Sequence, residues 1–137
     1  MIGDKIGEEQ GRVTGRRILP GDDPRYVKME VSYEAQSTVF GIKGMDLGTF
    51  TVYERVAGQM YGQGQGITMT ETGESAIWNG AGVGAPTGQG MGVRFAAAVT
   101  YQADPKGKLA RLNSIVGMVE YTEDADGKVH ITLTEWK

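Results

Sequence analysis

Residues 25–36 read RYVKMEVSYEAQ, and from Val27 onward apolar and polar side chains alternate. Val27, Met29, Val31 and Tyr33 share one face of an extended chain, and charged or hydroxyl side chains occupy the other. A helix would mix the two sets around its circumference. The stretch therefore predicts a strand in a sheet with one dry side.

Seven further segments show strand patterns, and turn residues separate them. We expect strands at about residues 11–19, 48–56, 59–70, 74–87, 91–103, 115–123 and 128–136. The intervening connections are short and rich in Gly, Pro and Asp. Strands joined in this way pair with their sequential neighbours, and closure removes exposed edges. We therefore predict a single all-β domain over residues 1–137, a closed antiparallel barrel of about eight strands.

Two rows of glycine lie on either side of the expected turn at residues 71–73. They are Gly62, Gly64 and Gly66, and Gly80, Gly82 and Gly84. Each row falls on one face of its strand, and equal distances from the turn place Gly62 opposite Gly82 or Gly84. A phosphate-binding loop would need a helix to follow the first strand, whereas another strand follows here. The rows therefore indicate sharp coiling or close backbone packing in a small barrel.

The composition of the chain disfavours two classes of binding partner, nucleic acids and membranes. The chain has 14 Lys and Arg residues against 17 Asp and Glu residues, and the basic residues are scattered apart from Arg16-Arg17 and residues 106–111. Nucleic-acid binding needs a concentrated basic face. No apolar run is long enough to span a membrane, and the acidic start differs from a secretory signal. We expect a cytoplasmic protein that binds neither nucleic acid nor membranes, with one short helical turn at residues 106–113.

The residue types that usually build metal and nucleophilic sites are scarce. The chain has no Cys, and His130 is its single His, expected on a partly exposed strand face. Asp124 and Asp126 match the beginning of a calcium loop, but the later ligands are missing, so a hairpin turn is expected. The sequence therefore predicts no metal and no cofactor.

The chain contains YGQGQGITMT at residues 61–70, GESAIW at 73–78, GAGVG at 80–84, KLARLN at 108–113 and a terminal Glu135-Trp136-Lys137. Together these segments resemble a widespread family of small uncharacterised bacterial proteins. At the level of the fold, the strand count and the Gly-rich hairpins are similar to barrels of the allene oxide cyclase-like and lipocalin-like kind. The resemblance implies a barrel, and it implies no catalytic residue because no cyclase motif matches this chain residue by residue.

Arg94 and Glu120 are charged residues in otherwise apolar strands that follow one another. If they point inward, they must pair, since an unpaired buried charge costs several kcal/mol. Such a pair could anchor a polar group of a ligand. If they face water instead, which is the reading we favour, they take no part in a site.

Two functional hypotheses follow. In the first, the barrel binds a small, largely apolar molecule, and isomerase- or cyclase-type chemistry is left open. An interior of this size is just wide enough for side chains or one small ligand. The candidate ligand-binding residues are Tyr53, Gln63, Gln65, Trp78, Arg94 and Glu120.

In the second hypothesis, the protein is a non-catalytic structural or interaction module. An apolar outer face would then join copies of the chain in a homo-oligomer. The residues expected at that interface are Met91, Val93, Phe95, Ala97 and Val99.

Overall fold

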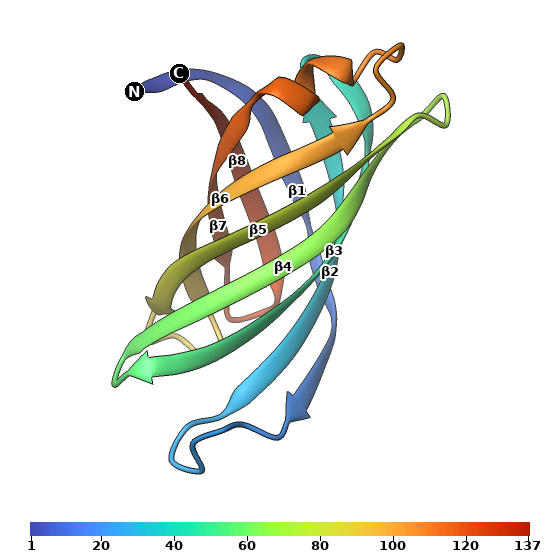
Figure 1. The fold of residues 1–137 in the computed structure, drawn as a ribbon. Helices are drawn as coiled ribbons and strands as arrows, with labels where there is room; N and C mark the ends of the chain where they lie inside the picture. Colours follow the sequence, from blue (N-terminus) through green and yellow to red (C-terminus); the bar gives the residue numbers. More distant parts are fainter.

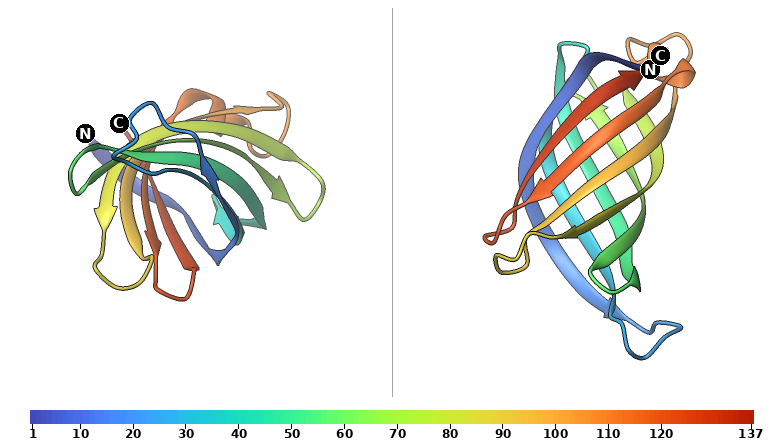
Figure 2. Two further views of the ribbon diagram at one scale, coloured as in Figure 1. Left: turned by 90° about the horizontal axis from the view of Figure 1, so that it is seen from below. Right: turned by 90° about the vertical axis from the view of Figure 1, so that its left-hand side faces the viewer.

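Eight antiparallel strands form a closed barrel in the computed structural model, which describes all residues 1–137 (Figure 1). The strands are β1 (Ile2–Leu19), β2 (Lys28–Val39), β3 (Ile42–Val56), β4 (Gln59–Thr70), β5 (Ser75–Pro86), β6 (Val93–Ala103), β7 (Val116–Glu123) and β8 (Lys128–Trp136). Each strand pairs with its sequential neighbour, and β8 pairs with β1, as the right-hand view of Figure 2 shows. The prediction of an all-β closed barrel is confirmed.

β1 and β3 begin earlier than the sequence pattern predicts. β1 begins at Ile2 rather than near Gly11, and β3 begins at Ile42 rather than near Gly48. The added segments lack clean alternation because glycines and charged residues interrupt them. The turn that precedes β3 is Phe40-Gly41, in which both residues have positive φ values of 52° and 75°. A tight hairpin turn requires this geometry, and Phe is an unusual residue for it.

One end of the barrel is covered by the single helical segment, the 3-10 helix η1 (Ala110–Ser114). It confirms the expected short helical turn near residues 106–113. Leu109, Leu112 and Ile115 point from this segment into the core and are at most 8% exposed. No helix here is long and apolar enough to cross a membrane. The opposite end of the barrel carries the β1–β2, β3–β4, β5–β6 and β7–β8 connections (Figure 1).

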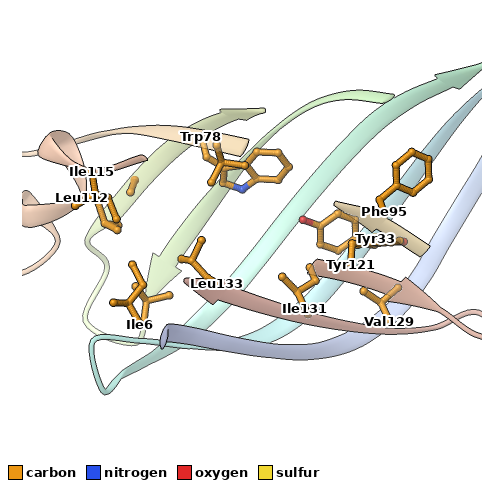
Figure 3. Close-up of a cluster of buried hydrophobic side chains, with 14 of the residues drawn as sticks. Ile6, Tyr33, Trp78, Phe95, Leu112, Ile115, Tyr121, Val129, Ile131 and Leu133 are labelled. Carbon is orange, nitrogen blue, oxygen red and sulfur yellow. The ribbon is translucent and has the colours of Figure 1, made fainter. Parts of the chain in front are cut away.

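Alternate residues of each strand fill the interior, and Figure 3 shows the result. Leu112 and Ile115 lie at the covered end, Phe95, Tyr33 and Tyr121 lie toward the other end, and Trp78 lies between. Phe95 and Val99 are only 7% and 6% exposed, and Val93 and Ala97 share their inward side of β6. The expected placement of these four residues on an outer interface is therefore wrong. Periodicity separates the two faces of a strand but does not say which one is inside.

A β-bulge in β1 changes which residues point inward. Val13 pairs with Tyr33 and Gly15 pairs with Ser32, so Thr14 is an extra residue in the ladder. Before the bulge, Glu9 and Val13 face the interior. After it, Arg16 pairs with the buried Val31 and faces the interior instead.

The two glycine rows face each other across β4 and β5, as predicted. Gly62 pairs with Gly82, and Gly64 pairs with Gly80. A Cβ atom added at Gly82 would collide with the backbone of β6, at 2.7 Å from the Cα of Ala97. At Gly62 the nearest atom would be 3.3 Å away, at the edge of the Phe95 ring. Close backbone approach is therefore strict at Gly82 and relaxed at Gly62.

Replacing Gly82 with Ala should destabilise the protein by about 1–3 kcal/mol, because β6 must move to admit the methyl group. The matched change Gly62→Ala should alter the free energy of unfolding by less than about 1 kcal/mol, since a ring edge can yield and Ala restricts the unfolded chain. Urea unfolding of both variants measures the difference. Equal stabilities would contradict close packing at Gly82.

Candidate functional site

Two cavities lie along the barrel axis. The inner cavity has a volume of about 80 Å³ and lies in the middle of the barrel, between Trp78 and Leu133 on one side and Phe95 and Tyr121 on the other. The second, which we call the mouth, has a volume of about 420 Å³ and lies at the end away from η1. Its lining is mainly apolar and includes Met29, Val52, Met60 and Val93, with the β1–β2 and β5–β6 loops around it. The interior is therefore incompletely filled by its own side chains.

An aromatic layer separates the two cavities. It consists of Tyr33, Phe50, Phe95 and Tyr121, whose neighbouring ring centroids lie 5.3 to 6.5 Å apart. Phe50 and Phe95 line both cavities. The rings meet at tilted or edge-to-face angles, which are the favourable arrangements for aromatic pairs. Phe50 and Phe95 are therefore the part of the layer that the mouth and the inner cavity share.

Asp46 is the centre of a polar network in the wall of the inner cavity. Asp46 is 3% exposed, and its carboxylate accepts hydrogen bonds from side chains of three other strands. Trp78 Nε1 donates at 2.7 Å, the Tyr33 hydroxyl at 3.0 Å and the Thr68 hydroxyl at 3.4 Å. These donors orient the carboxylate and fix the Trp78 ring against the cavity.

Glu9 lies beside Asp46, and its surroundings favour the protonated carboxyl. Burial, the charge of Asp46 and a hydrogen bond to Asp46 raise the pKa of Glu9 well above its ordinary value of 4.5. Glu9 therefore keeps its proton at pH values where an exposed Glu has lost it. Glu9 Oε1 is buried without a hydrogen-bond partner, and so is the hydroxyl of Ser37, the residue opposite Glu9 on β2.

The tyrosines near this pair stay protonated. Burial is the largest cause that raises the pKa of Tyr33 and of Tyr101, and the charges of Asp46 and Glu9 add to it. Tyr101 also lines the inner cavity. The inner cavity therefore combines neutral phenol groups with a carboxyl group, Glu9, whose protonated form is favoured.

A different charged group lies at the mouth. Glu123 has a side chain that is 1% exposed, and it pairs with Arg16 at 2.5 Å and accepts a hydrogen bond from the Tyr121 hydroxyl at 2.9 Å. Burial and the Glu123 carboxylate raise the pKa of Tyr121. The bulge in β1 makes the pair because it turns Arg16 inward. Arg16 and Glu123 thus compensate each other on the mouth side of the aromatic layer.

Three of the six predicted site residues lie near these cavities. Trp78 lines the inner cavity, and Tyr53 lines the mouth. Gln63 points outward from β4 and donates to the Tyr61 hydroxyl, yet it borders the inner cavity because its neighbours Gly62 and Gly64 have no side chains. The structure does not bring these three residues together at one point.

The other three predicted residues lie on the outer surface. Gln65 donates to the carbonyl oxygen of Thr49. Arg94 and Glu120 form an ion pair at 3.2 Å with side chains 62% and 56% exposed. An exposed pair of this kind contributes under about 1 kcal/mol. Arg94 and Glu120 therefore face water and do not line the cavities, which confirms the interpretation favoured from the sequence.

Two smaller expectations are confirmed. His130 is a half-exposed strand residue whose Nε2 lies 2.9 Å from Glu8 Oε1. Hydrogen bonds from Lys5 and His130 hold the pKa of Glu8 at about 2. Residues 124–127 form a hairpin turn, in which Gly127 has a φ of 80°.

Sequence reasoning missed Glu9, Asp46, Arg16 and Glu123. Asp46 has the same strand parity as Phe50 and Val52, so extending β3 by one alternation would have placed it inside. Glu9 likewise shares its parity with Val13. Arg16 offers no such signal, because the bulge at Thr14 reverses the parity before it.

Two solved structures share this fold over nearly the whole chain. A protein of unknown function from Clostridium acetobutylicum ATCC 824 has a TM-score of 0.80 and 10% identity, with 98% of both chains covered. A conserved protein of unknown function from Rhodopseudomonas palustris has a TM-score of 0.76 and 12% identity, covering 98% of this chain and 97% of that chain. No family model and no curated protein matches. The chain is thus similar to uncharacterised bacterial proteins with a barrel fold, and the allene oxide cyclase-like and lipocalin-like resemblance is not confirmed.

The raised pKa of Glu9 predicts a specific pH dependence of stability. Below about pH 4.5, Glu9 is protonated in the folded and unfolded chain alike. As the pH rises further, the unfolded chain loses this proton and the folded chain keeps it. The contribution of Glu9 to the free energy of unfolding therefore falls by up to about 1.4 kcal/mol per pH unit until the folded pKa is reached.

The Glu9→Gln variant should gain stability relative to the unmodified protein as the pH rises from about 4.5 toward about 8. Urea unfolding across this range measures the difference. Glu34→Gln, a change at an exposed position on β2, is the matched control and should track the unmodified protein. Parallel curves for the Glu9→Gln and Glu34→Gln variants would contradict a retained proton.

Proposed function

We propose that this barrel binds a small, largely apolar molecule, which enters through the mouth and reaches the inner cavity. The observation that carries the proposal is the apolar mouth and the aromatic-walled inner cavity, which share Phe50 and Phe95 as their partition. Apolar pockets with a few convergent polar groups are the usual form of small-molecule sites. Asp46, Glu9 and Tyr33 are the convergent polar groups here.

The dimensions limit the ligand. A volume of about 420 Å³ at the mouth lies within the range of about 300 to 1,000 Å³ that is usual for ligand pockets. The inner cavity, at about 80 Å³, has room for about six non-hydrogen atoms. A linear ligand could place its end in the inner cavity and the rest of its chain in the mouth. Isomerase- or cyclase-type chemistry would need a proton donor at the ligand, and Glu9 is the candidate for that role.

A second function, self-association, is favoured by a patch on the outside of the barrel. Leu47, Ile67 and Ile77 are register partners across β3, β4 and β5, and Met45 pairs with Met69 beside them. Ile77, Met45 and Leu47 are 51%, 44% and 37% exposed. We call these five residues the outer apolar patch. It replaces the interface expected at residues 91–99.

Ligand entry can be followed through Trp78. The chain has two Trp residues, and Trp136 is 51% exposed on the outside, so Trp136→Phe leaves Trp78 as the reporter in the inner cavity. We expect a saturable change in Trp78 emission with linear alcohols from 1-butanol to 1-decanol. Affinity should rise about fourfold for each CH₂ group, the equivalent of about 0.8 kcal/mol, until the mouth is filled.

In the same background, Met60→Lys places a charge in the lining of the mouth and should weaken 1-decanol binding at least about tenfold. Met118→Lys makes the same change on the outer face of β7, where Met118 is 37% exposed, and should leave binding unchanged. The absence of a saturable signal with every alcohol would overturn the binding function.

Self-association has a separate test in sedimentation velocity. If the outer apolar patch joins two copies, Ile67→Lys should convert an associated species to a monomer without loss of the fold, because a charge would be buried unpaired in the interface. Ile18→Lys, at a residue 64% exposed at the end of β1, is the control. A monomer for the unmodified protein at high concentration would remove this second function.

A further inference from the structure

The inner cavity contains a buried negative charge without a cationic partner. Glu9 and Asp46 are 5% and 3% exposed, and a pair of carboxyl groups in which Glu9 keeps its proton carries one negative charge. No Lys, Arg or His forms an ion pair with either residue. Arg16 is the inward-facing cation of β1, and it is engaged by Glu123 at the mouth. A buried charge of this kind destabilises the fold unless something compensates it.

The charged groups that act on the Tyr33 and Tyr101 hydroxyls are all acidic. Burial raises the pKa of Tyr33 and of Tyr101, the charges of Asp46 and Glu9 raise both further, and no cation acts in the opposite direction on either hydroxyl. The field of these acidic groups at the two hydroxyls is therefore negative. Such a field favours a positively charged guest.

The walls also suit a cation. Trp78, Tyr33, Tyr101 and Phe50 line the cavity, and the faces of aromatic rings attract a cation through their quadrupoles. This attraction is strongest when the cation has been removed from water. The aromatic walls of the cavity can therefore stabilise an organic ammonium group together with its alkyl substituent.

An unpartnered acceptor completes the site. Glu9 lines the cavity, and its Oε1 atom is buried without a hydrogen-bond donor. Asp46, by contrast, already accepts three side-chain hydrogen bonds. The incomplete position in the cavity wall therefore belongs to Glu9, and a primary ammonium group can fill it because it brings N–H donors.

We propose that the inner cavity selects a small primary ammonium ion, whose N–H groups donate to Glu9 and whose alkyl chain lies against the aromatic layer. Asp46 and Glu9 together supply the compensating charge. This inference rests on the proposed function, since it uses the same cavity and the same entrance, and it specifies the class of ligand.

The test compares 1-pentylammonium with 1-pentanol, which have the same number of non-hydrogen atoms and nearly the same shape. Both are titrated into the Trp136→Phe variant at neutral pH and followed by Trp78 emission. We expect the ammonium ion to bind at least tenfold more tightly than the alcohol. The double variant Glu9→Gln, Asp46→Asn should lose that preference.

A second measurement uses the unmodified protein and does not depend on the folding of the double variant. The carboxyl pair carries one negative charge, so a bound ammonium ion balances it with no proton leaving the site, whereas binding as the neutral amine would release one proton to the buffer. Calorimetry in two buffers of different ionisation enthalpy measures that release, which should be absent for 1-pentylammonium. Equal affinities for the two probes, or release of a proton on 1-pentylammonium binding, would overturn the inference while leaving the proposed function in place. Failure of both probes to bind would count against the proposed function itself.

Discussion

The narrow, fixed cross-section of a closed eight-stranded sheet is the constraint on which the rest of this structure depends. Inward side chains from all eight strands compete for the same space along one axis. Aromatic residues from β2, β3, β6 and β7 occupy much of that space in the aromatic layer. The glycine rows of β4 and β5 supply the complementary thin wall, since a side chain at Gly82 would meet the backbone of β6. Large residues on one side and no side chains on the other are thus two parts of one packing solution.

A polar network in such a core must be held in one arrangement to be stable. Asp46 achieves this by accepting hydrogen bonds from β2, β4 and β5, so that the carboxylate couples strands on both sides of its own. Glu9 extends the network to β1, but its buried Oε1 atom lacks a hydrogen-bond donor. An incomplete network in a packed core is costly, and such sites are more typical of binding than of folding. The cavity beside it is consistent with that interpretation.

Much of the fold follows from local sequence patterns. Strand number, antiparallel pairing and the glycine register all derive from alternation and from turn residues, and the structure confirms them. The site was harder to predict, since alternation in β6 identifies the pair of faces without distinguishing inside from outside. That ambiguity placed Phe95 and Val99 on an interface instead of in the core. Asp46 and Glu9 escaped notice because glycine and charged residues obscure the first part of their strands, and hydrogen bonds among four strands decide their role.

The bulge at Thr14 reverses the alternation of inward and outward residues within a single strand. Ahead of it, β1 presents Glu9 to the inner cavity, and beyond it the same strand presents Arg16 to the mouth. If Thr14 were instead paired in a regular ladder, it would lie opposite Ser32, Arg16 would lie opposite Glu30, the guanidinium would turn outward and Glu123 would be left buried alone. Among relatives of this chain with the same spacing, a bulge retained between the two inward charges of β1 would mark those that keep opposite charges on the two sides of the aromatic layer.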